Sequence, residues 1–149
     1  MIEVILEDER WEAVGLEALA GPAEREALAI TGRMPEEFEI AVMGCDDTRI
    51  ATLNADFRGK PTATNVLSWP ASGTPPMDGG ELGDIAIAYE TCAREAAEKG
   101  VSVHHHVTHL LIHGILHLLG YDHISDADAE EMEALEIKAL AKLGISNPY

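Results

Sequence analysis

All seven histidines of this chain lie between His104 and His123, and three of them have the spacing of ligands for one metal ion. His113 and His117 are four residues apart, so on a helix they project from one face about one turn apart. Gly120 allows the helix to end, and the turn that follows can bring His123 to the same point. Three neutral imidazoles with a fourth position left for water are the ligands of a catalytic zinc ion, so we expect one Zn²⁺ per chain.

The same spacing leaves two alternatives open. His109 shares the helix face of His113, but it lies a turn away from the return of His123, so we expect it beside the metal or on the substrate side. The pattern H-x3-H-x5-H also occurs in metzincin proteases, in which a glutamate general base follows the first histidine. Here that residue is Gly114. The sequence therefore disfavours peptide hydrolysis while it keeps the three ligands.

The charge of the chain is strongly acidic. Among 149 residues, 27 are Asp or Glu and 10 are Lys or Arg, which gives a formal net charge of −17. This balance disfavours a protein that grips nucleic acid through a wholly basic surface. Between Phe57 and Gly80, however, the only acidic residue is Asp78, so Arg58 and Lys60 can form a local positive patch. The alternative, which the residues alone favour, is that Arg58 forms a surface salt bridge with one of the many carboxylates. Arginine suits such a patch because its planar fork matches two phosphate oxygens.

Other features place the chain among single-domain proteins of the cytoplasm. The length predicts one domain over residues 1–149. Cys45 and Cys92 form no C-x-x-C pair, so we expect neither a disulfide framework nor a thiolate zinc site. The acidic N-terminal stretch is unlike a signal peptide, and no apolar run reaches the roughly 18 residues of a membrane span. We therefore expect a soluble, cytoplasmic protein without a membrane partner.

The elements that must position the histidines follow from periodicity and from turn residues. Strands are predicted over 2–6, 38–43, 65–69 and 85–89, and residues 70–80 read as a long loop that could serve as an active-site flap. Helices are predicted over 11–29 with an interruption at Gly21-Pro22, after Asp46 or Asp47, and over 90–99, 103–119 and 127–143. The expected class is α+β, a small mixed four-stranded sheet packed with about five helices, with the zinc site at the end of a helix in the C-terminal half.

Several carboxylates near the histidines have two interpretations each. Asp84 and Asp122 could orient a ligand histidine or simply cap a turn. The last predicted helix carries an acidic set that we interpret as a solvated face, with a docking surface for a basic partner protein as the alternative: Asp126, Asp128, Glu130, Glu131, Glu133 and Glu136.

Three blocks of the sequence together resemble one known family. Residues 113–123 read H-G-I-L-H-L-L-G-Y-D-H, which fits the signature H-G-x-L-H-L-x-G-Y-D-H at every fixed position. Residues 53–70, with F-R-G-K at 57–60 and N-V-L-S-W-P at 65–70, and residues 82–85, L-G-D-I, agree as well. From Leu53 onward, over about two-thirds of the chain, the sequence resembles YbeY, the bacterial rRNA-maturation endoribonucleases. One departure is the segment 60–64, K-P-T-A-T, in which a basic residue of the family is lost.

The resemblance implies roles for individual residues. His113, His117 and His123 would hold the zinc ion, Arg58 would be the catalytic arginine, and Lys60 a possible substrate contact. The implied function is a zinc-dependent, single-strand-specific endoribonuclease in 3′-end processing of small-subunit rRNA and in ribosome quality control. Its partners would be single-stranded rRNA and the small ribosomal subunit with its basic proteins, and no DNA. The alternatives are a non-catalytic ribosome-assembly factor with structural zinc and a zinc hydrolase of another substrate class.

Overall fold

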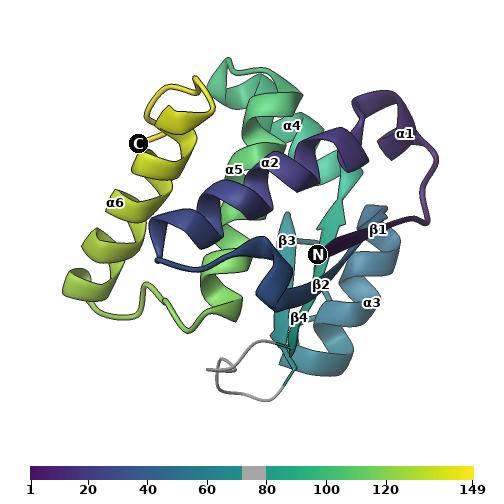
Figure 1. Ribbon diagram of the computed structural model, residues 1–149. Helices are drawn as coiled ribbons and strands as arrows, with labels where there is room; N and C mark the ends of the chain where they lie inside the picture. The colour runs from purple at the N-terminus through teal and green to yellow at the C-terminus, as the bar shows by residue number, and fades with distance from the viewer. Residues whose placement is uncertain (72–79) are drawn as a thin grey trace.

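The computed structural model describes residues 1–71 and 80–149, which form a mixed four-stranded sheet with helices on both faces (Figure 1). The strand order is β1-β2-β4-β3; the first three are mutually parallel, and β3 runs antiparallel to β4 at the edge. This confirms the predicted α+β class. The strands are β1 Ile2–Leu6, β2 Phe38–Cys45, β3 Val66–Pro70 and β4 Gly80–Ala88.

Six α-helices and one short 3₁₀ helix lie within the described ranges, against about five helices expected. The helices are α1 Arg10–Val14, α2 Leu16–Ile30, η1 Pro35–Glu37, α3 Asp47–Arg58, α4 Tyr89–Lys99, α5 Val103–Leu118 and α6 Asp126–Lys142. The last three helices begin and end within a few residues of the predicted bounds. A left-handed glycine, Gly100, ends α4, and the side chains of Ser102 and Ser125 cap the two helices that follow.

The two faces of the sheet bury different clusters because side chains alternate along a strand. In β2, Phe38, Ile40 and Val42 point into the main core, which the helices α2, α5 and α6 share. Cys45 belongs to a smaller cluster on the other face with Ile50 of α3. The helix α3 therefore lies on the opposite side of the sheet from α2 and α5 (Figure 1).

Helix α5 occupies the centre of the main core. Eleven of its sixteen residues are buried, as expected for a helix that is apolar on almost every side. Gly114 allows it to approach the sheet closely: a Cβ at that position would lie 3.1 Å from Ile85 Cδ1 and 3.2 Å from Ser68 Oγ. The position of α5 is thus set by contacts with β3 and β4 before any metal is considered.

The predicted interruption at Gly21-Pro22 is wrong, because α2 runs through both residues. The break lies earlier, at Gly15, whose φ of +81° ends α1. Helix α2 buries Ala20, Ala23, Ala27 and Leu28 against the core, and this burial outweighs the cost of an interior proline.

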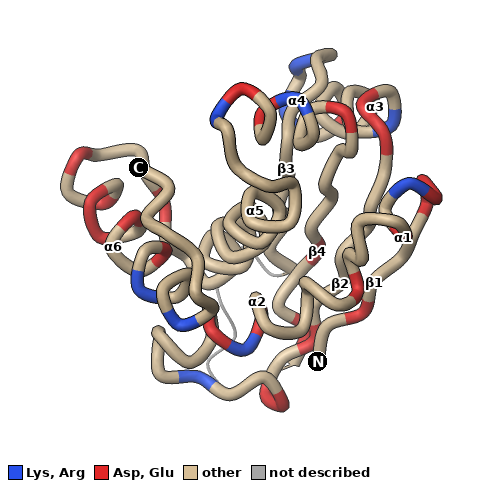
Figure 2. Tube along the Cα trace, turned by 90° about the horizontal axis from the view of Figure 1, so that it is seen from above, with Lys and Arg blue, Asp and Glu red and all other residues tan. Residues whose placement is uncertain are grey.

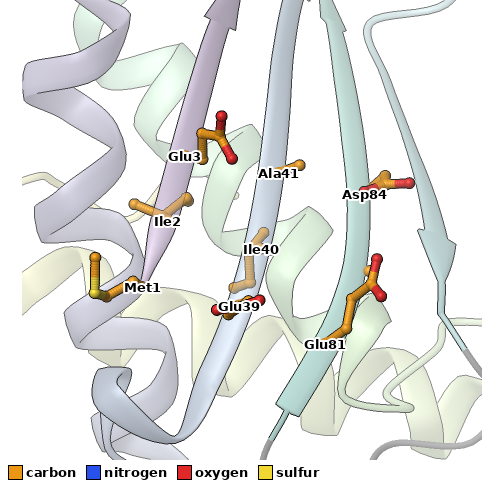
Figure 3. Close-up of a pocket in the computed structure, with 9 residues that line it drawn as sticks. Met1, Ile2, Glu3, Glu39, Ile40, Ala41, Glu81 and Asp84 are labelled. Carbon is orange, nitrogen blue, oxygen red and sulfur yellow. The ribbon is translucent and has the colours of Figure 1, made fainter.

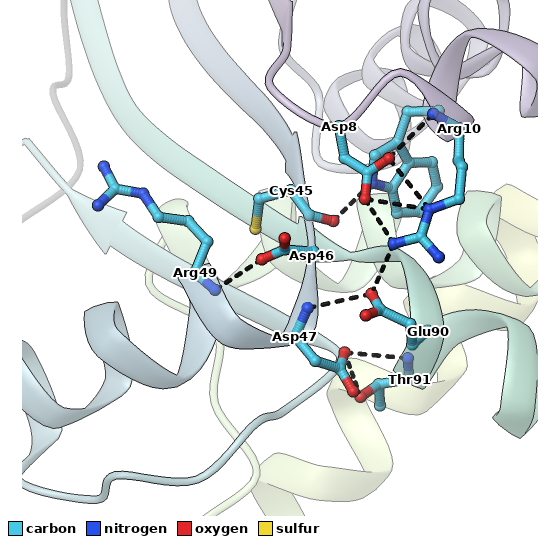
Figure 4. A network of polar contacts seen from close by, with 9 residues as sticks. Asp8, Arg10, Cys45, Asp46, Asp47, Arg49, Glu90 and Thr91 are labelled. Atoms are coloured by element: carbon cyan, nitrogen blue, oxygen red, sulfur yellow. Dashed lines mark hydrogen bonds and ion pairs between the residues drawn. The ribbon is translucent and has the colours of Figure 1, made fainter.

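Polar contacts join the three chain segments that leave the carboxyl ends of the parallel strands (Figure 4). Arg10 Nη2 lies 2.6 Å from Asp8 Oδ2 and 3.2 Å from Glu90 Oε1. Glu90 in turn accepts the backbone N–H of Asp47 at 3.1 Å, and the Asp47 carboxylate accepts the Thr91 hydroxyl at 2.8 Å. Each polar group is paired with another of the network, so we interpret it as structural.

The segment predicted as an active-site flap falls largely on residues 72–79, which lie outside the described residues. Among the helices that are described, none is long and apolar enough to cross a membrane.

Gly44 and Gly21 offer a matched test of the packing. A Cβ on Gly44 would lie 2.6 Å from Trp11 Cδ1 and 2.8 Å from Leu16 Cδ2, whereas a Cβ on Gly21 would have no neighbour within 4 Å. We expect Gly44→Ala to lower the free energy of unfolding by about 1–3 kcal/mol through overpacking. Gly21→Ala should raise it by about 0.5–1 kcal/mol through helix propensity. Urea unfolding measures both, and unchanged stability in Gly44→Ala would contradict this packing.

Candidate metal centre

Three imidazoles converge where α5 ends. His113 and His117 lie in the last turns of α5, and His123 lies in the connection to α6. The ring centroids of His113 and His117 are 4.6 Å apart, and those of His117 and His123 are 5.2 Å apart. One donor nitrogen from each ring lies within 4.8 Å of the other two. The three side chains could therefore hold one metal ion.

The return of His123 depends on how α5 ends. Gly120, at φ +100°, donates its N–H to the carbonyl of His117 at 3.0 Å, and Tyr121 donates to the carbonyl of Leu116 at 3.1 Å. These bonds satisfy carbonyls that the end of a helix leaves free, and the left-handed glycine reverses the chain. The connection thereby carries His123 back to the face of α5 that bears the other two histidines.

His117 fits a metal ligand because it is neutral at physiological pH. Burial, together with the neighbouring imidazoles of His113 and His123, lowers the pKa of His117 to about 4. An unprotonated imidazole is the form that coordinates a metal. Nitrogen donors of this kind suit zinc and related transition metals rather than magnesium or calcium.

A buried carboxylate lies directly behind the histidines. Glu136 of α6 is only 1% exposed, and its Oε2 lies 3.1 Å from His113 Nδ1. Its Oε1 accepts the Tyr149 hydroxyl at 2.6 Å and also contacts His109 Nε2. Burial raises the pKa of Glu136, but the hydrogen bonds from His109, His113 and Tyr149 outweigh it and lower this pKa to about 2. Glu136 is therefore an ionised carboxylate inside the protein.

The interpretation of the acidic α6 set as a solvated face is wrong for Glu136. This residue shares the buried side of α6 with Met132, Ala139 and Leu140. Their spacing of four, three and one residues follows one helical stripe, so periodicity alone could have identified Glu136 as a carboxylate on an apolar face. A buried carboxylate without partners is costly, which is the signal that its neighbours are hydrogen-bond donors.

His109 lies one turn before His113 on α5 and is not part of the converging triad. It is buried, and its Nε2 contacts Glu136 while its ring packs edge-on against the Tyr149 ring at 5.5 Å between centroids. The carboxylate thus holds two histidines of the same helix face, one within the triad and one beside it.

A cleft of about 830 Å³ opens over the triad, between the edge strand β3 and helix α5. Arg58, the last residue of α3, is exposed and lines this cleft. Asp122 lines it too, and its Oδ1 accepts the N–H of Ile124 at 3.2 Å, which makes it a turn cap. Lys60 is exposed just beyond the left-handed Gly59 and does not line the cleft.

The sequence analysis did not identify the residues of α4 that line this cleft. One is Glu95, whose Oε1 accepts hydrogen bonds from Asn65 Nδ2 and from His106 Nε2, each at 2.9 Å. The other is Lys99, in the last turn of α4. Lys99 gives the cleft a second cation besides Arg58, although no motif in the sequence marks it.

Asp84 lies away from the histidines. Its neighbour Ile85 faces Gly114 of α5, so Asp84 points to the other side of the sheet. There it lines a cavity of about 240 Å³ together with Glu81 of the same strand, Glu39 of β2 and Glu3 of β1 (Figure 3). Acidic residues also recur along α6 (Figure 2). The cations of the cleft therefore stand out against an otherwise acidic chain.

The packing of Gly114 explains why a protease-like glutamate is absent. The Cβ of any side chain at position 114 would lie 3.1 Å from Ile85 Cδ1 and 3.2 Å from Ser68 Oγ. The helix approaches the sheet at the point where metzincins carry their general base. The structure thus supports the sequence argument against peptide hydrolysis.

The lowered pKa of His117 predicts an acid-sensitive metal-free protein. Its ordinary pKa is 6.5, so between about pH 6.5 and pH 4 the unfolded chain binds a proton that the folded chain does not. The contribution of His117 to the free energy of unfolding is fully present above pH 6.5 and is lost as the pH is lowered towards 4. We expect the Tm of chelator-treated protein to fall between pH 7 and pH 5, and to fall less in His117→Gln.

The buried His106, whose pKa is also lowered by burial, contributes in the same direction, so the decisive quantity is the difference between wild type and variant. An equal fall in both proteins would contradict a buried, neutral His117.

The comparisons with known proteins agree with this geometry. The sequence matches the family model described as Endoribonuclease YbeY over residues 8–144. The chain is 52% identical to "Endoribonuclease YbeY" of Dinoroseobacter shibae, over 99% of this chain and 90% of that protein. It is 53% identical to the protein of the same description from Paracoccus denitrificans, over 99% and 89%.

A solved structure extends the likeness to the fold. The solution structure of TM1509 from Thermotoga maritima superposes with a TM-score of 0.62 at 24% identity, and the match covers 97% of this chain and 92% of that one. At this identity the likeness concerns the fold alone. The family itself rests on the full-length sequence matches, and by them this chain belongs to the YbeY endoribonuclease family.

Proposed function

We propose that residues 1–149 form a single YbeY-like metallohydrolase domain, a cytoplasmic zinc-dependent endoribonuclease that cuts single-stranded RNA. The observation that carries the proposal is the convergence of three imidazoles in a cleft that also presents Arg58. Membership of the family supports RNA as the substrate. The finer assignment, 3′-end processing of small-subunit rRNA and ribosome quality control, follows from the resemblance of the signature residues.

In this proposal His113, His117 and His123 hold one Zn²⁺ per chain. The chemistry that zinc supplies in such a site is Lewis-acid stabilisation of negative charge on a phosphodiester. Asp122 contributes by capping the turn that presents His123. The remaining work belongs to the residues of the chain that bind and orient the RNA.

Arg58 is the residue we propose to bind the scissile phosphate. Its guanidinium keeps its charge when desolvated, and its fork can donate to two phosphate oxygens at once. Negative charge grows on those oxygens as the phosphodiester is attacked, so this contact strengthens towards the transition state. Lys99 in the cleft and the exposed Lys60, two residues after Arg58, add attraction for the RNA backbone where the chain is otherwise acidic.

An exposed aromatic side chain supports the preference for single strands. Phe57, next to Arg58, is 64% exposed, lines the cleft and packs edge-on against Trp69 at 5.2 Å. Unpaired bases can stack on such a ring, whereas bases inside a duplex are already stacked on each other. Phe57 thus offers a platform for a base beside the phosphate that Arg58 binds.

We further propose that basic proteins of the small ribosomal subunit bring the enzyme to its substrate. The net charge of −17 and the carboxylates of Glu3, Glu39, Glu81 and Asp84 at one cavity support such partners. Complementary charge of this kind speeds association and selects partners. A non-catalytic assembly factor would share this surface but would not need Arg58.

The decisive assay is cleavage of a single-stranded RNA that carries the small-subunit rRNA 3′ region, using zinc-replete protein. We expect Arg58→Ala to lower the cleavage rate by about 10²-fold or more, because one preorganised contact to the developing charge is lost. His117→Ala should abolish cleavage through loss of the metal. Arg94→Ala removes the same charge from an exposed position that does not line the cleft, and should leave the rate unchanged.

Circular dichroism on all four proteins checks that they fold alike. Equal cutting by every protein would reveal a contaminating nuclease. Intact in vivo function of Arg58→Ala, combined with unfolding on zinc removal, would overturn the enzymatic proposal in favour of the assembly factor.

A further inference from the structure

Glu136 is the one carboxylate in direct contact with a triad histidine among the described residues, and the proposed RNA chemistry gives it no role. We propose that Glu136 is a positioning residue that holds His113 in the tautomer with its proton on Nδ1, so that Nε2 is presented to the metal. This inference rests on the proposed metal centre. It concerns the order of the ligands before any metal or RNA is bound.

The hydrogen-bond inventory of the carboxylate leads to this tautomer. The Tyr149 hydroxyl and two imidazole nitrogens surround the two carboxylate oxygens, which are hydrogen-bond acceptors, so each of these groups is placed to donate. The Oε2 of Glu136 lies 3.1 Å from His113 Nδ1, so Nδ1 is the nitrogen placed to carry the proton. A neutral imidazole has only one such proton, which leaves Nε2 with a free lone pair.

The other carboxylate oxygen has its own donors. Oε1 accepts the Tyr149 hydroxyl at 2.6 Å and contacts His109 Nε2, which must donate by the same argument. These partners satisfy both carboxylate oxygens of Glu136, of which only 1% is exposed. Tyr149 and His109 thus hold in place the Glu136 carboxylate, which accepts the Nδ1 proton of His113.

The expected benefit is preorganisation of the metal site. A histidine that is free to turn or to change tautomer must be ordered when the metal binds, and that ordering weakens the affinity. A carboxylate that fixes the ring of a ligand histidine typically accounts for 10- to 100-fold in metal affinity. Glu136 comes from α6 and His113 from α5, so this device exists only once the two helices have packed.

A purely structural role is the rival explanation. Glu136 could serve only to attach α6 to α5 through buried hydrogen bonds, with no effect on which nitrogen of His113 is free. The structural role predicts lower stability of the metal-free variant and unchanged metal affinity. The positioning role predicts a changed tautomer and weaker metal binding.

The first test needs no substitution. Long-range ¹H–¹⁵N correlation spectra of metal-free wild type at pH 7.5 report which ring nitrogen of His113 carries the proton. We expect the proton on Nδ1. A proton on Nε2 would overturn the proposal, because Glu136 would then have no donor to accept from that ring.

The second test compares two variants that remove the same charge from α6. Glu136→Gln cannot accept from all three donors, and we expect its dissociation constant for Zn²⁺ to rise about 10- to 100-fold in competition with a chromophoric chelator. Glu131→Gln lies on the exposed side of α6 and should bind Zn²⁺ as wild type does. Equal zinc affinity in the two variants would overturn the proposal.

The variant Tyr149→Phe distinguishes the loss of a hydrogen-bond donor to Glu136 from the loss of the carboxylate itself. It removes the hydroxyl bond to Glu136 but keeps the carboxylate and the His113 contact, so zinc affinity should weaken less than in Glu136→Gln. A loss as large as in Glu136→Gln would contradict the assignment to the carboxylate.

Failure of this inference and failure of the proposed function give different results. An active ribonuclease with the His113 proton on Nε2 overturns the inference alone. A protein with the expected tautomer and zinc affinity that cuts no RNA overturns the proposed function alone.

Discussion

The close contact of helix α5 with the sheet is the constraint on which the rest of this structure depends. Gly114 lets the helix approach Ile85 and Ser68, and the helix is buried on nearly every side. A rigid, buried helix fixes the directions of the side chains in its last turns. His113 and His117 therefore start from defined positions, and only the turn at Gly120 is needed to complete the triad.

The same contact limits the chemistry. A glutamate in place of Gly114, where metzincin proteases carry their general base, would press on the side chains of Ile85 and Ser68, which would have to shift. The cleft instead offers Arg58 and Lys99, two cations in a chain of charge −17, beside the carboxylates Glu95 and Asp122. In so acidic a chain, these two cations are the groups near the triad that can attract an RNA backbone. The combination favours phosphodiester over peptide substrates.

Polar contacts bring distant segments of the chain together in two places. Glu136, which is buried, joins α6 to α5 at the triad, and its oxygens are paired with hydrogen-bond donors as burial requires. The Asp8–Arg10–Glu90 contacts join the segments that follow β1 and β4, and they lie at the surface. The first set supports the histidine triad, and the second supports the sheet on which the central helix packs.

The amino-acid sequence by itself determined the α+β class, most element bounds and the spacing that lets three histidines converge, since these depend on local periodicity, caps and glycines. It misplaced the helix break, because burial of α2 outweighs the local effect of Pro22. Only the tertiary structure decided that Glu136 is buried behind His113, that Lys99 enters the cleft, and that Asp84 faces the other side of the sheet. The physical reason is that each of these outcomes depends on a contact between elements far apart in the chain, which local patterns do not encode.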